Sequence, residues 1–331
     1  MIDILNIKPH QVSRDLSGYT IMFYGAPKTG KTTIASRFEK TLILAFEAGY
    51  KAIPGIMAAP VTSWSDFKKI IKQLKSEEAH QMYKNIAVDT ADIAYDLCEK
   101  YICAQNGVDS IKEVPYGQGW TQAKREFDEC LRAITMMDYG LILISHSQDK
   151  TFTDENGNEY NQIVPTLSNG PRLIVDRMAD ILGYAAPVQN EDGSTKTILY
   201  MRGTPRFVAG SRFAYTPDSI EFTYENLVKA VNDAIDKQGE VSGTESITDA
   251  KFNAPSESKL DFTALMNEFQ LCVTKLQQKA GDNETFGKEY APKITEITAK
   301  YLGKGRKVSD CTPDQAEQLS LIVDDMRDLI S

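Results

Sequence analysis

The stretch YGAPKTGKTT, from Tyr24 to Thr33, decides the fold. It contains the pattern Gly-x-x-x-x-Gly-Lys-Thr, it follows the apolar run YTIMFYG, and a helical pattern begins at Lys31. A strand, a glycine-rich turn and a helix in this order form a loop whose backbone N–H groups surround the phosphates of a nucleoside triphosphate. The stretch therefore predicts a nucleotide-binding P-loop, and the alternative is a glycine-rich turn with a structural role only.

The residues of this loop have predicted roles in binding and catalysis. The Lys31 side chain is expected to contact the β- and γ-phosphates and to act in catalysis, and the Thr32 hydroxyl is expected to hold Mg²⁺. The predicted nucleotide-binding residues are Gly25, Ala26, Pro27, Lys28, Thr29, Gly30, Lys31, Thr32 and Thr33. The predicted ligands are therefore ATP and Mg²⁺.

A second predicted metal residue, Asp89, ends the apolar run NIAVD. An acid at the end of a buried strand beside a phosphate loop is in the place of the carboxylate that orients Mg²⁺ through water. The alternative is a helix cap, because Asp89 or Thr90 precedes the next helical pattern. Both roles are compatible with one position.

Two further strand ends carry candidate catalytic side chains. Glu47 ends the run TLILAFE, and a carboxylate there is able to polarise the water that attacks the γ-phosphate. His146 ends the run GLILISH and is expected to sense the γ-phosphate, because the tip of a central strand faces the nucleotide crevice. The alternatives are a solvated acid for Glu47 and an ordinary strand end for His146.

The order of strand-like and helical runs predicts the architecture. From Tyr19 to His146 the two kinds of run alternate, which predicts an α/β fold with a mainly parallel sheet and helices on both faces. Residues 148–168 are polar and are predicted as a loop, and TKTILYMRG is predicted as an antiparallel addition. The predicted domains are an ATPase core at 1–240, a polar linker at 241–259 and a small three-helix unit at 260–331.

Composition limits the class of protein and its compartment. The 331 residues carry a net charge of −9, which disfavours a general polyanion binder but leaves local nucleic-acid contacts possible. The five cysteines form no C-x-x-C pair, so neither a disulfide framework nor a zinc site is predicted, and a reducing compartment fits. With no signal peptide and no long apolar run, a cytoplasmic protein without a membrane partner is expected.

The order of these motifs resembles the RecA-family ATPase core, and most of all the short phage-encoded RecA-like proteins of recombination and single-strand annealing. The resemblance covers about residues 15–240 and rests on the phosphate loop, FEAGYKAI, IAVD and LILISHSQ. It implies that Glu47 activates water. It also implies that His146, or Gln148 beside it, couples the nucleotide to a DNA-binding loop. The implied partners are single-stranded DNA and further copies of the chain, in a filament or a ring.

The resemblance also implies two DNA-binding segments, one near NGVDSIKEVPYGQGW and one at 148–168. Aromatic rings in such segments stack on unpaired bases, whereas the alternative is ordinary surface loops. The candidate DNA-binding residues are Lys112, Tyr116, Lys150, Phe152, Tyr160 and Gln162. Cationic residues acting on the nucleotide of a neighbouring subunit are implied in MRGTPRFVAGSRF, where the alternative is solvated strand charges. These candidates are Arg202, Arg206 and Arg212.

The function that these features favour is ATP-dependent binding of single-stranded DNA in recombination or annealing, with ATP hydrolysis stimulated by DNA. One alternative is a helicase-related motor or loader ATPase that acts on a protein partner. The other is a nucleotide-dependent structural switch that binds no DNA. The resemblance ends at the linker, and the acidic three-helix unit is expected to contact a protein partner or another subunit.

Overall fold

The computed structural model describes residues 11–243 and 261–330. The chain divides into two compact units, Met1–Phe252 and Asn253–Ser331, and each is described by itself. None of the helices that the structure describes combines the length and apolar character needed to span a bilayer.

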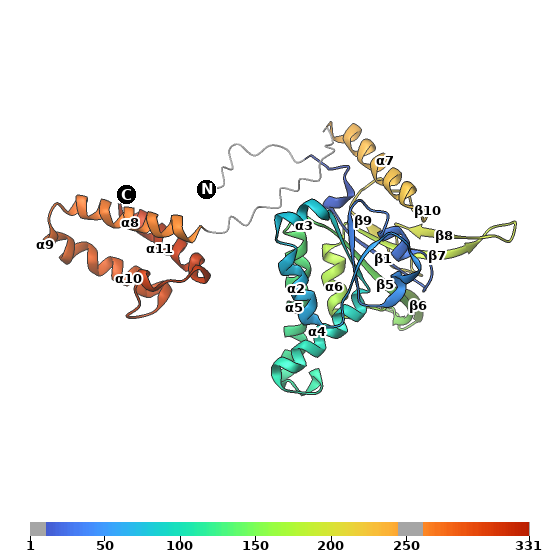
Figure 1. Cartoon of the computed structure of the whole chain (residues 1–331), viewed down its shortest axis with the longest axis horizontal. Coiled ribbons are helices and arrows are strands. Elements are labelled where there is room, and N and C mark those ends of the chain that lie inside the picture. The colour runs from blue at the N-terminus through green and yellow to red at the C-terminus, as the bar shows by residue number, and fades with distance from the viewer. Residues whose placement is uncertain (1–10, 244–260, 331) are drawn as a thin grey trace. The chain divides into compact units, whose positions relative to one another are not determined.

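One sheet organises the larger unit (Figure 1). Its strands are β1 (Thr20–Gly25), β2 (Thr41–Ala45), β3 (Met57–Pro60), β4 (Asn85–Asp89), β5 (Gly140–Thr153), β6 (Glu159–Pro165), β7 (Ile181–Gln189), β8 (Thr195–Tyr200), β9 (Gly210–Ser211) and β10 (Ser219–Glu221). They follow the order β10-β8-β7-β1-β5-β4-β2-β3, with β6 paired to β5 and β9 to β7. Within this order, neighbouring strands are parallel in the section β7-β1-β5-β4-β2-β3. Strands β6, β8, β9 and β10 are antiparallel additions. The predicted mainly parallel α/β fold is confirmed.

Helices cover both faces of this sheet. The helical elements of the larger unit are η2 (Leu16–Gly18), α1 (Lys31–Ala35), η3 (Ala48–Ala52), α2 (Trp64–Gln73), α3 (Glu77–Met82), α4 (Ala91–Asn106), η4 (Ile111–Glu113), η5 (Pro115–Gly117), α5 (Gln118–Thr135), α6 (Asn169–Met178) and α7 (Tyr224–Ser242). One hydrophobic core contains residues of α2, α4, α5 and α6, and a second contains residues of α1 and α7. The two cores lie on opposite faces of the sheet (Figure 1).

Strand β1 shows why the sheet is buried on both faces. Met22 and Tyr24 belong to the core under α2, α4 and α5, whereas Ile21 and Phe23 belong to the core under α1 and α7. Successive side chains of a strand point to opposite faces, so a strand between two helical layers must be apolar at every position. The uninterrupted run IMFY meets this requirement, and all four side chains are fully buried.

Helix α2 illustrates how local sequence signals define the covering layer. The Ser63 hydroxyl accepts a hydrogen bond from the backbone N–H of Asp66 and caps the first turn. Trp64, Phe67 and Ile71 then repeat at helical spacing and are buried against the sheet. Ser65 and Lys69 between them are exposed, whereas Lys68 forms an ion pair with Glu126 of α5.

The polar segment predicted as a loop forms an ordered β-hairpin, so that prediction is wrong. β5 continues beyond the main sheet, and from Ser147 onward it pairs with β6. The turn between them is closed by Asp154, whose carboxylate accepts hydrogen bonds from the backbone of Asn156 and Asn158. Apart from the rings of Phe152 and Tyr160, residues 148–153 of β5 and 159–162 of β6 are polar, and they are exposed or half-buried. The sequence therefore lacks the alternation of apolar and polar residues that identifies a half-buried strand.

The smaller unit is helical. Its elements are α8 (Phe262–Ala280), α9 (Asn283–Thr285), η6 (Phe286–Tyr290), α10 (Ala291–Leu302), η7 (Val308–Asp310), η8 (Pro313–Gln315) and α11 (Ala316–Ile330). Helix α11 packs against α8 and α10, and its fully buried residues Leu319, Ile322 and Met326 share a core with Leu276 of α8. Of the predicted linker, residues 244–259 lie outside the described residues, and α7 extends into its first positions.

Candidate nucleotide-binding site

Two glycines give the predicted phosphate loop its backbone path. Gly25 ends β1 opposite Ala185 of β7, and a Cβ atom at Gly25 would lie 2.1 Å from the Ala185 carbonyl oxygen. Gly30 precedes α1 with a φ of +87°, a left-handed conformation that side chains disfavour. Both glycines of the sequence pattern are therefore required by the local backbone.

The side chain of Lys31 is held inside the loop. It is 5% exposed, and its Nζ donates hydrogen bonds to the carbonyl oxygens of Gly25 (2.9 Å) and Ala26 (2.8 Å). Burial lowers the pKa of Lys31, and the nearby carboxylates of Asp89 and Glu47 oppose that shift. A buried ammonium group whose partners are neutral carbonyls is a favourable place for phosphate oxygens.

Asp89 and Thr32 meet beside this lysine. The Thr32 hydroxyl donates to Asp89 Oδ2 at 2.7 Å, and Asp89 is 2% exposed. Its Oδ1 atom is buried and has no hydrogen-bond partner among the described residues. Burial raises the pKa of Asp89, and the negative charge of Glu47 adds to this effect. The hydrogen bond from Thr32 and the positive charge of Lys31 oppose this shift but do not outweigh burial.

These two side chains fit a Mg²⁺ ion. Mg²⁺ prefers hard oxygen ligands and is usually held by one or two protein side chains together with phosphates and water. A hydroxyl and a buried carboxylate with an unpartnered oxygen provide such a donor set. The described part of the chain contains no cluster of three or more His, Cys, Asp or Glu residues suited to a metal.

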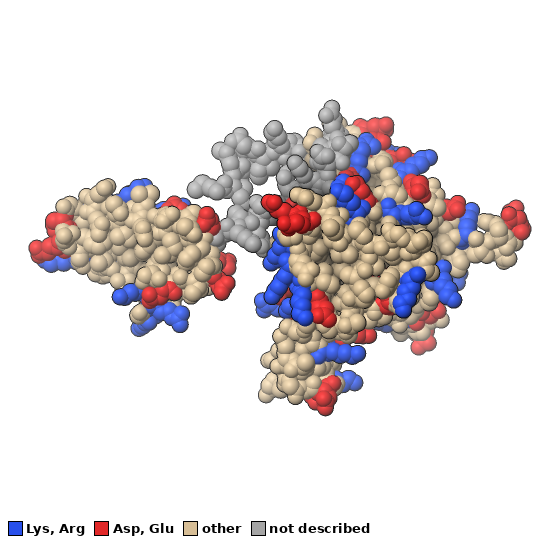
Figure 2. Space-filling model, viewed as in Figure 1, with Lys and Arg blue, Asp and Glu red and all other residues tan. Residues whose placement is uncertain are grey.

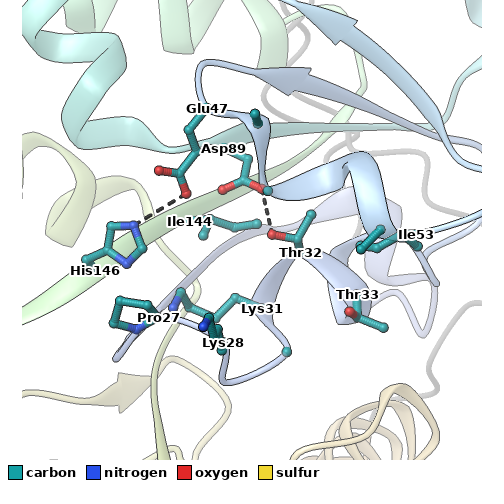
Figure 3. A pocket seen from close by; sticks show the side chains of 14 residues that line it. Pro27, Lys28, Lys31, Thr32, Thr33, Glu47, Ile53, Asp89, Ile144 and His146 are labelled. Carbon is teal, nitrogen blue, oxygen red and sulfur yellow. Dashed lines mark hydrogen bonds and ion pairs between the residues drawn. The ribbon is translucent and has the colours of Figure 1, made fainter.

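Glu47 and His146 face each other across the site. The backbone N–H groups of Phe46 and Glu47 donate to the Asp89 carbonyl oxygen (2.7 and 3.3 Å), which fixes Glu47 beside Asp89. Glu47 Oε1 lies 3.4 Å from His146 Nε2, and Figure 3 shows the imidazole directed at the Glu47 carboxylate. The His146 Nδ1 atom is buried without a hydrogen-bond partner in the part of the chain that is described.

The strand order explains why these residues converge. β5 lies between β1 and β4, and β2 follows β4, so the carboxyl ends of four parallel strands meet at one edge of the sheet. They enclose a cavity of about 650 Å³. The residues that line it are Pro27, Lys28, Gly30, Lys31, Thr32, Thr33, Glu47, Ala48, Gly49, Ala52, Ile53, Asp89, Ile144 and His146.

Part of this lining was not predicted from the sequence. Element η3 contributes Ala48, Gly49 and Ala52, and the residue after it contributes the Ile53 side chain. Ile144 comes from β5. Small and apolar side chains carry no chemical signature. Their only sequence signal is position, since η3 directly follows Glu47.

The hairpin of β5 and β6 places four predicted DNA-binding residues on one face. Its register pairs Lys150 with Gln162 and Phe152 with Tyr160, and residues that are paired or two apart share a face. The rings of Phe152 and Tyr160 stack with centroids 5.8 Å apart, and the Lys150 Nζ lies 5.4 Å from the Phe152 ring. Tyr160 is 42% exposed.

The other predicted DNA-binding segment lies elsewhere on the unit, at the end of the α4–α5 pair (Figure 1). Lys112 belongs to η4 and Tyr116 to η5. Tyr116 is 97% exposed, and Trp120 in the first turn of α5 is 39% exposed. The predicted aromatic side chains are therefore accessible at this second site, but they lie apart from the hairpin.

The three candidate arginines differ in their partners. Arg202 donates to the carbonyl oxygens of Phe213 (2.8 Å) and Ala214 (2.7 Å), and Arg212 forms an ion pair with Asp180 (2.9 Å). Arg206 is exposed, and its guanidinium has no hydrogen bond or ion pair with any residue in the described ranges. Arg202 and Arg212 are thus engaged within their own subunit, although the Arg212 side chain is still 58% exposed.

The chain is similar to a known family and to individual known proteins. Residues 17–213 match a family model described as an AAA domain (AAA_24). The SPbeta prophage-derived uncharacterized protein YorG of Bacillus subtilis (strain 168) is 33% identical over 343 residues, which cover 100% of this chain and 99% of YorG. A solved structure, the flagellar accessory protein FlaH from Methanocaldococcus jannaschii, is 13% identical with a TM-score of 0.34, over 62% of this chain and 85% of FlaH.

The family match covers more than half of the chain and includes every residue of the candidate site. The phosphate loop, Glu47, Asp89 and His146 all lie within residues 17–213. The likeness to YorG extends over the whole chain, including the smaller helical unit. The chain therefore belongs to the AAA domain family of P-loop ATPases.

Proposed function

We propose that the chain is a phage-encoded ATPase of the RecA-like recombination or annealing type, which binds single-stranded DNA when ATP and Mg²⁺ are bound and releases it after hydrolysis. The observation that carries this proposal is the face of the β5–β6 hairpin. It presents two stacked rings, a lysine and a glutamine, and it grows from the strand that contributes His146 to the nucleotide site. The likeness to a prophage protein supports the phage origin.

The chemistry of the site follows from the groups that line it. Bound Mg²⁺·ATP supplies the γ-phosphoryl group that water attacks. Lys31 offsets phosphate charge from inside the loop, and Thr32 and Asp89 provide the oxygens for the metal. Glu47 accepts a proton from the attacking water at its carboxylate, and His146 Nε2 orients that carboxylate.

The DNA contact is expected to depend more on stacking than on charge. The chain has a net charge of −9, and Figure 2 shows cationic and anionic side chains interspersed around a broad uncharged area on the visible face of the larger unit. Base–aromatic stacking contributes about 1–3 kcal/mol per base and tolerates any sequence. Phe152 and Tyr160 therefore provide the main affinity, and Lys150 adds a single phosphate contact.

An oligomer is part of the same proposal. Arg206 lacks a partner within the described residues, whereas Arg202 and Arg212 stabilise their own subunit. A cation from a neighbouring copy stabilises charge that develops on the phosphates and makes hydrolysis depend on assembly. Arg206→Ala is expected to lower the ATPase rate per chain at high protein concentration, while Lys237→Ala, an exposed cation on α7, is the matched control.

The test is fluorescence anisotropy of a labelled single-stranded oligonucleotide with the full chain, Mg²⁺ and a non-hydrolysable ATP analogue. We expect binding that weakens when the analogue is replaced by ADP. Absence of binding with the analogue at low salt, together with intact ATP hydrolysis, would contradict the proposal. That result would favour a motor or loader that acts on a protein partner.

A further inference from the structure

Both strands of the β5–β6 hairpin reach the nucleotide site. The first strand passes through His146 before it enters the hairpin. The return strand ends at Pro165, and the next residue, Thr166, lies back against the start of the hairpin. Its backbone N–H donates to the His146 carbonyl oxygen at 2.9 Å. The base of the hairpin is therefore closed at the residue that faces Glu47.

The Thr166 side chain extends this connection to a second part of the site. Its hydroxyl donates to Asp92 Oδ2 at 2.9 Å, and the Ser145 hydroxyl lies 3.1 Å from Thr166 Oγ1. Asp92 stands in the first turn of α4, three residues after Asp89. The side chains thus connect the segment that holds the metal carboxylate to the return strand of the hairpin.

This hydroxyl has three possible acceptors, one of which is the Ser145 hydroxyl at 3.1 Å. The His146 carbonyl oxygen lies 3.3 Å from Thr166 Oγ1, and the Asp92 carboxylate lies 2.9 Å from it. A hydroxyl carries one proton, so it donates to one of them at a time. The carboxylate is the strongest acceptor. The second oxygen of Asp92, Oδ1, is buried and has no hydrogen-bond partner within the described ranges, so the carboxylate depends on Thr166.

We propose that Thr166 and Asp92 are positioning residues that transmit the nucleotide state of the site to the β5–β6 hairpin. Displacement of Asp92, which lies in the first turn of α4 three residues after Asp89, moves the acceptor of the Thr166 hydroxyl and with it the return strand. The proposal rests on the proposed function only in placing a nucleotide at the loop. It does not require the hairpin to bind DNA.

The test is hydrogen exchange of the hairpin amides, measured in the full chain with and without Mg²⁺ and a non-hydrolysable ATP analogue. In the wild type we expect the analogue to change the exchange rate of amides between Gln148 and Ile163 by about fivefold or more, as for an ordinary coupling between sites. In Thr166→Val, which keeps the shape and removes the hydroxyl, the change is expected to fall below about twofold. Affinity for a fluorescent ATP analogue stays at the wild-type value.

The matched control is Thr151→Val. Thr151 also donates a hydrogen bond from its hydroxyl, to Asn161 Oδ1 at 2.8 Å, but this bond lies within the hairpin and reaches no part of the nucleotide site. The control is expected to keep the full nucleotide-dependent change. A purely structural role of Thr166 would instead alter exchange equally with and without the analogue.

A second pair of variants keeps the test decisive if Thr166→Val does not fold. Asp92→Asn retains an oxygen acceptor and is expected to keep the coupling, whereas Asp92→Ala is expected to lose it. Retention of the full change in Thr166→Val or Asp92→Ala would overturn the proposal, as would a wild-type hairpin that does not respond to the analogue. Failure of the wild type to bind DNA would overturn the proposed function but not the proposed role of Thr166 and Asp92.

Discussion

The nucleotide site and the β5–β6 hairpin share strand β5 but satisfy their polar groups in opposite ways. In the site, buried atoms of Asp89 and His146 have no hydrogen-bond partner among the described residues. In the hairpin, Thr151 bonds Asn161, Lys150 bonds Asn169, and the turn is closed by Asp154. Unpartnered buried groups reduce stability and are retained where a ligand supplies the partner. The site therefore has buried polar atoms that a bound ligand can satisfy, whereas these polar groups of the hairpin are satisfied by the chain itself.

The largest effect is expected at the lysine inside the phosphate loop. Lys31→Ala removes the buried cation and is expected to lower kcat/KM for ATP by at least about 10²–10³, because charge stabilisation in a closed site is a dominant catalytic contribution. Steady-state ATP hydrolysis measures this. Lys69→Ala on the exposed face of α2 is the control and should keep wild-type activity. Near-normal hydrolysis by Lys31→Ala would remove the loop from the active site.

Glu47→Gln separates binding from turnover. The substitution preserves the shape of the side chain and removes the proton acceptor, so kcat is expected to fall by about 10²–10⁴ while nucleotide affinity is kept. Single-turnover hydrolysis and binding of a fluorescent nucleotide measure the two quantities. Glu39→Gln, which alters an exposed carboxylate paired with Lys84, is the matched control. An unchanged kcat for Glu47→Gln would assign water activation to another group.

The hairpin is tested by its two rings. Phe152→Ala/Tyr160→Ala is expected to weaken binding of single-stranded DNA by at least about tenfold, because each stacked base contributes about 1–3 kcal/mol and about 1.4 kcal/mol is one decade. Hydrolysis without DNA should persist, since neither ring lines the nucleotide cavity. Anisotropy with the ATP analogue is the measurement, and Tyr215→Ala, another exposed aromatic, is the control. Equal affinities of the double variant and the wild type would exclude this face.

The smallest effect concerns the stability of the empty site. Burial raises the folded-state pKa of Asp89 above its unfolded value, so the ionised carboxylate destabilises the nucleotide-free protein at neutral pH. This group's contribution to stability is greatest at low pH and is lost as the pH rises through the folded-state pKa. Asp89→Asn is expected to raise Tm at pH 7 by about 2–4 °C, which corresponds to about 1 kcal/mol.

Thermal unfolding without nucleotide, at neutral and acidic pH, measures this difference, which should shrink as the wild-type carboxyl is protonated. Asp66→Asn is the control with the opposite sign, because hydrogen bonds from Lys69 and Ser63 lower the pKa of Asp66 and favour its charge. A lower Tm for Asp89→Asn at neutral pH would show that the carboxylate already has a stabilising partner.

The nucleotide site could be predicted from the sequence better than the hairpin. The phosphate loop, Asp89, Glu47 and His146 each follow an apolar strand, and parallel strands bring their carboxyl ends to one edge of a sheet. A local pattern therefore predicts both the fold and the convergence of these residues. The candidate DNA-binding residues of the hairpin share one face because of a register that no hydrophobic pattern reveals, so that segment is misread as a loop.

Long-range polar contacts lie beyond sequence reasoning for a different reason. Thr166 and Asp92 are 74 residues apart, and neither belongs to a motif. Arg202 and Arg212 are equivalent to Arg206 in the sequence, but only the folded chain shows that two of the three are engaged within their own subunit. Such pairings depend on tertiary geometry, whereas the phosphate loop depends on residues that are adjacent in the chain.

The most direct test of the account is the rate of ATP hydrolysis by the full chain with and without a single-stranded oligonucleotide, at saturating ATP and Mg²⁺. The account predicts that the oligonucleotide raises kcat in the wild type, and that this increase is lost in Phe152→Ala/Tyr160→Ala while the basal rate remains. Equal rates with and without the oligonucleotide, in a wild type that hydrolyses ATP, would contradict the coupling of the nucleotide site to a DNA-binding hairpin.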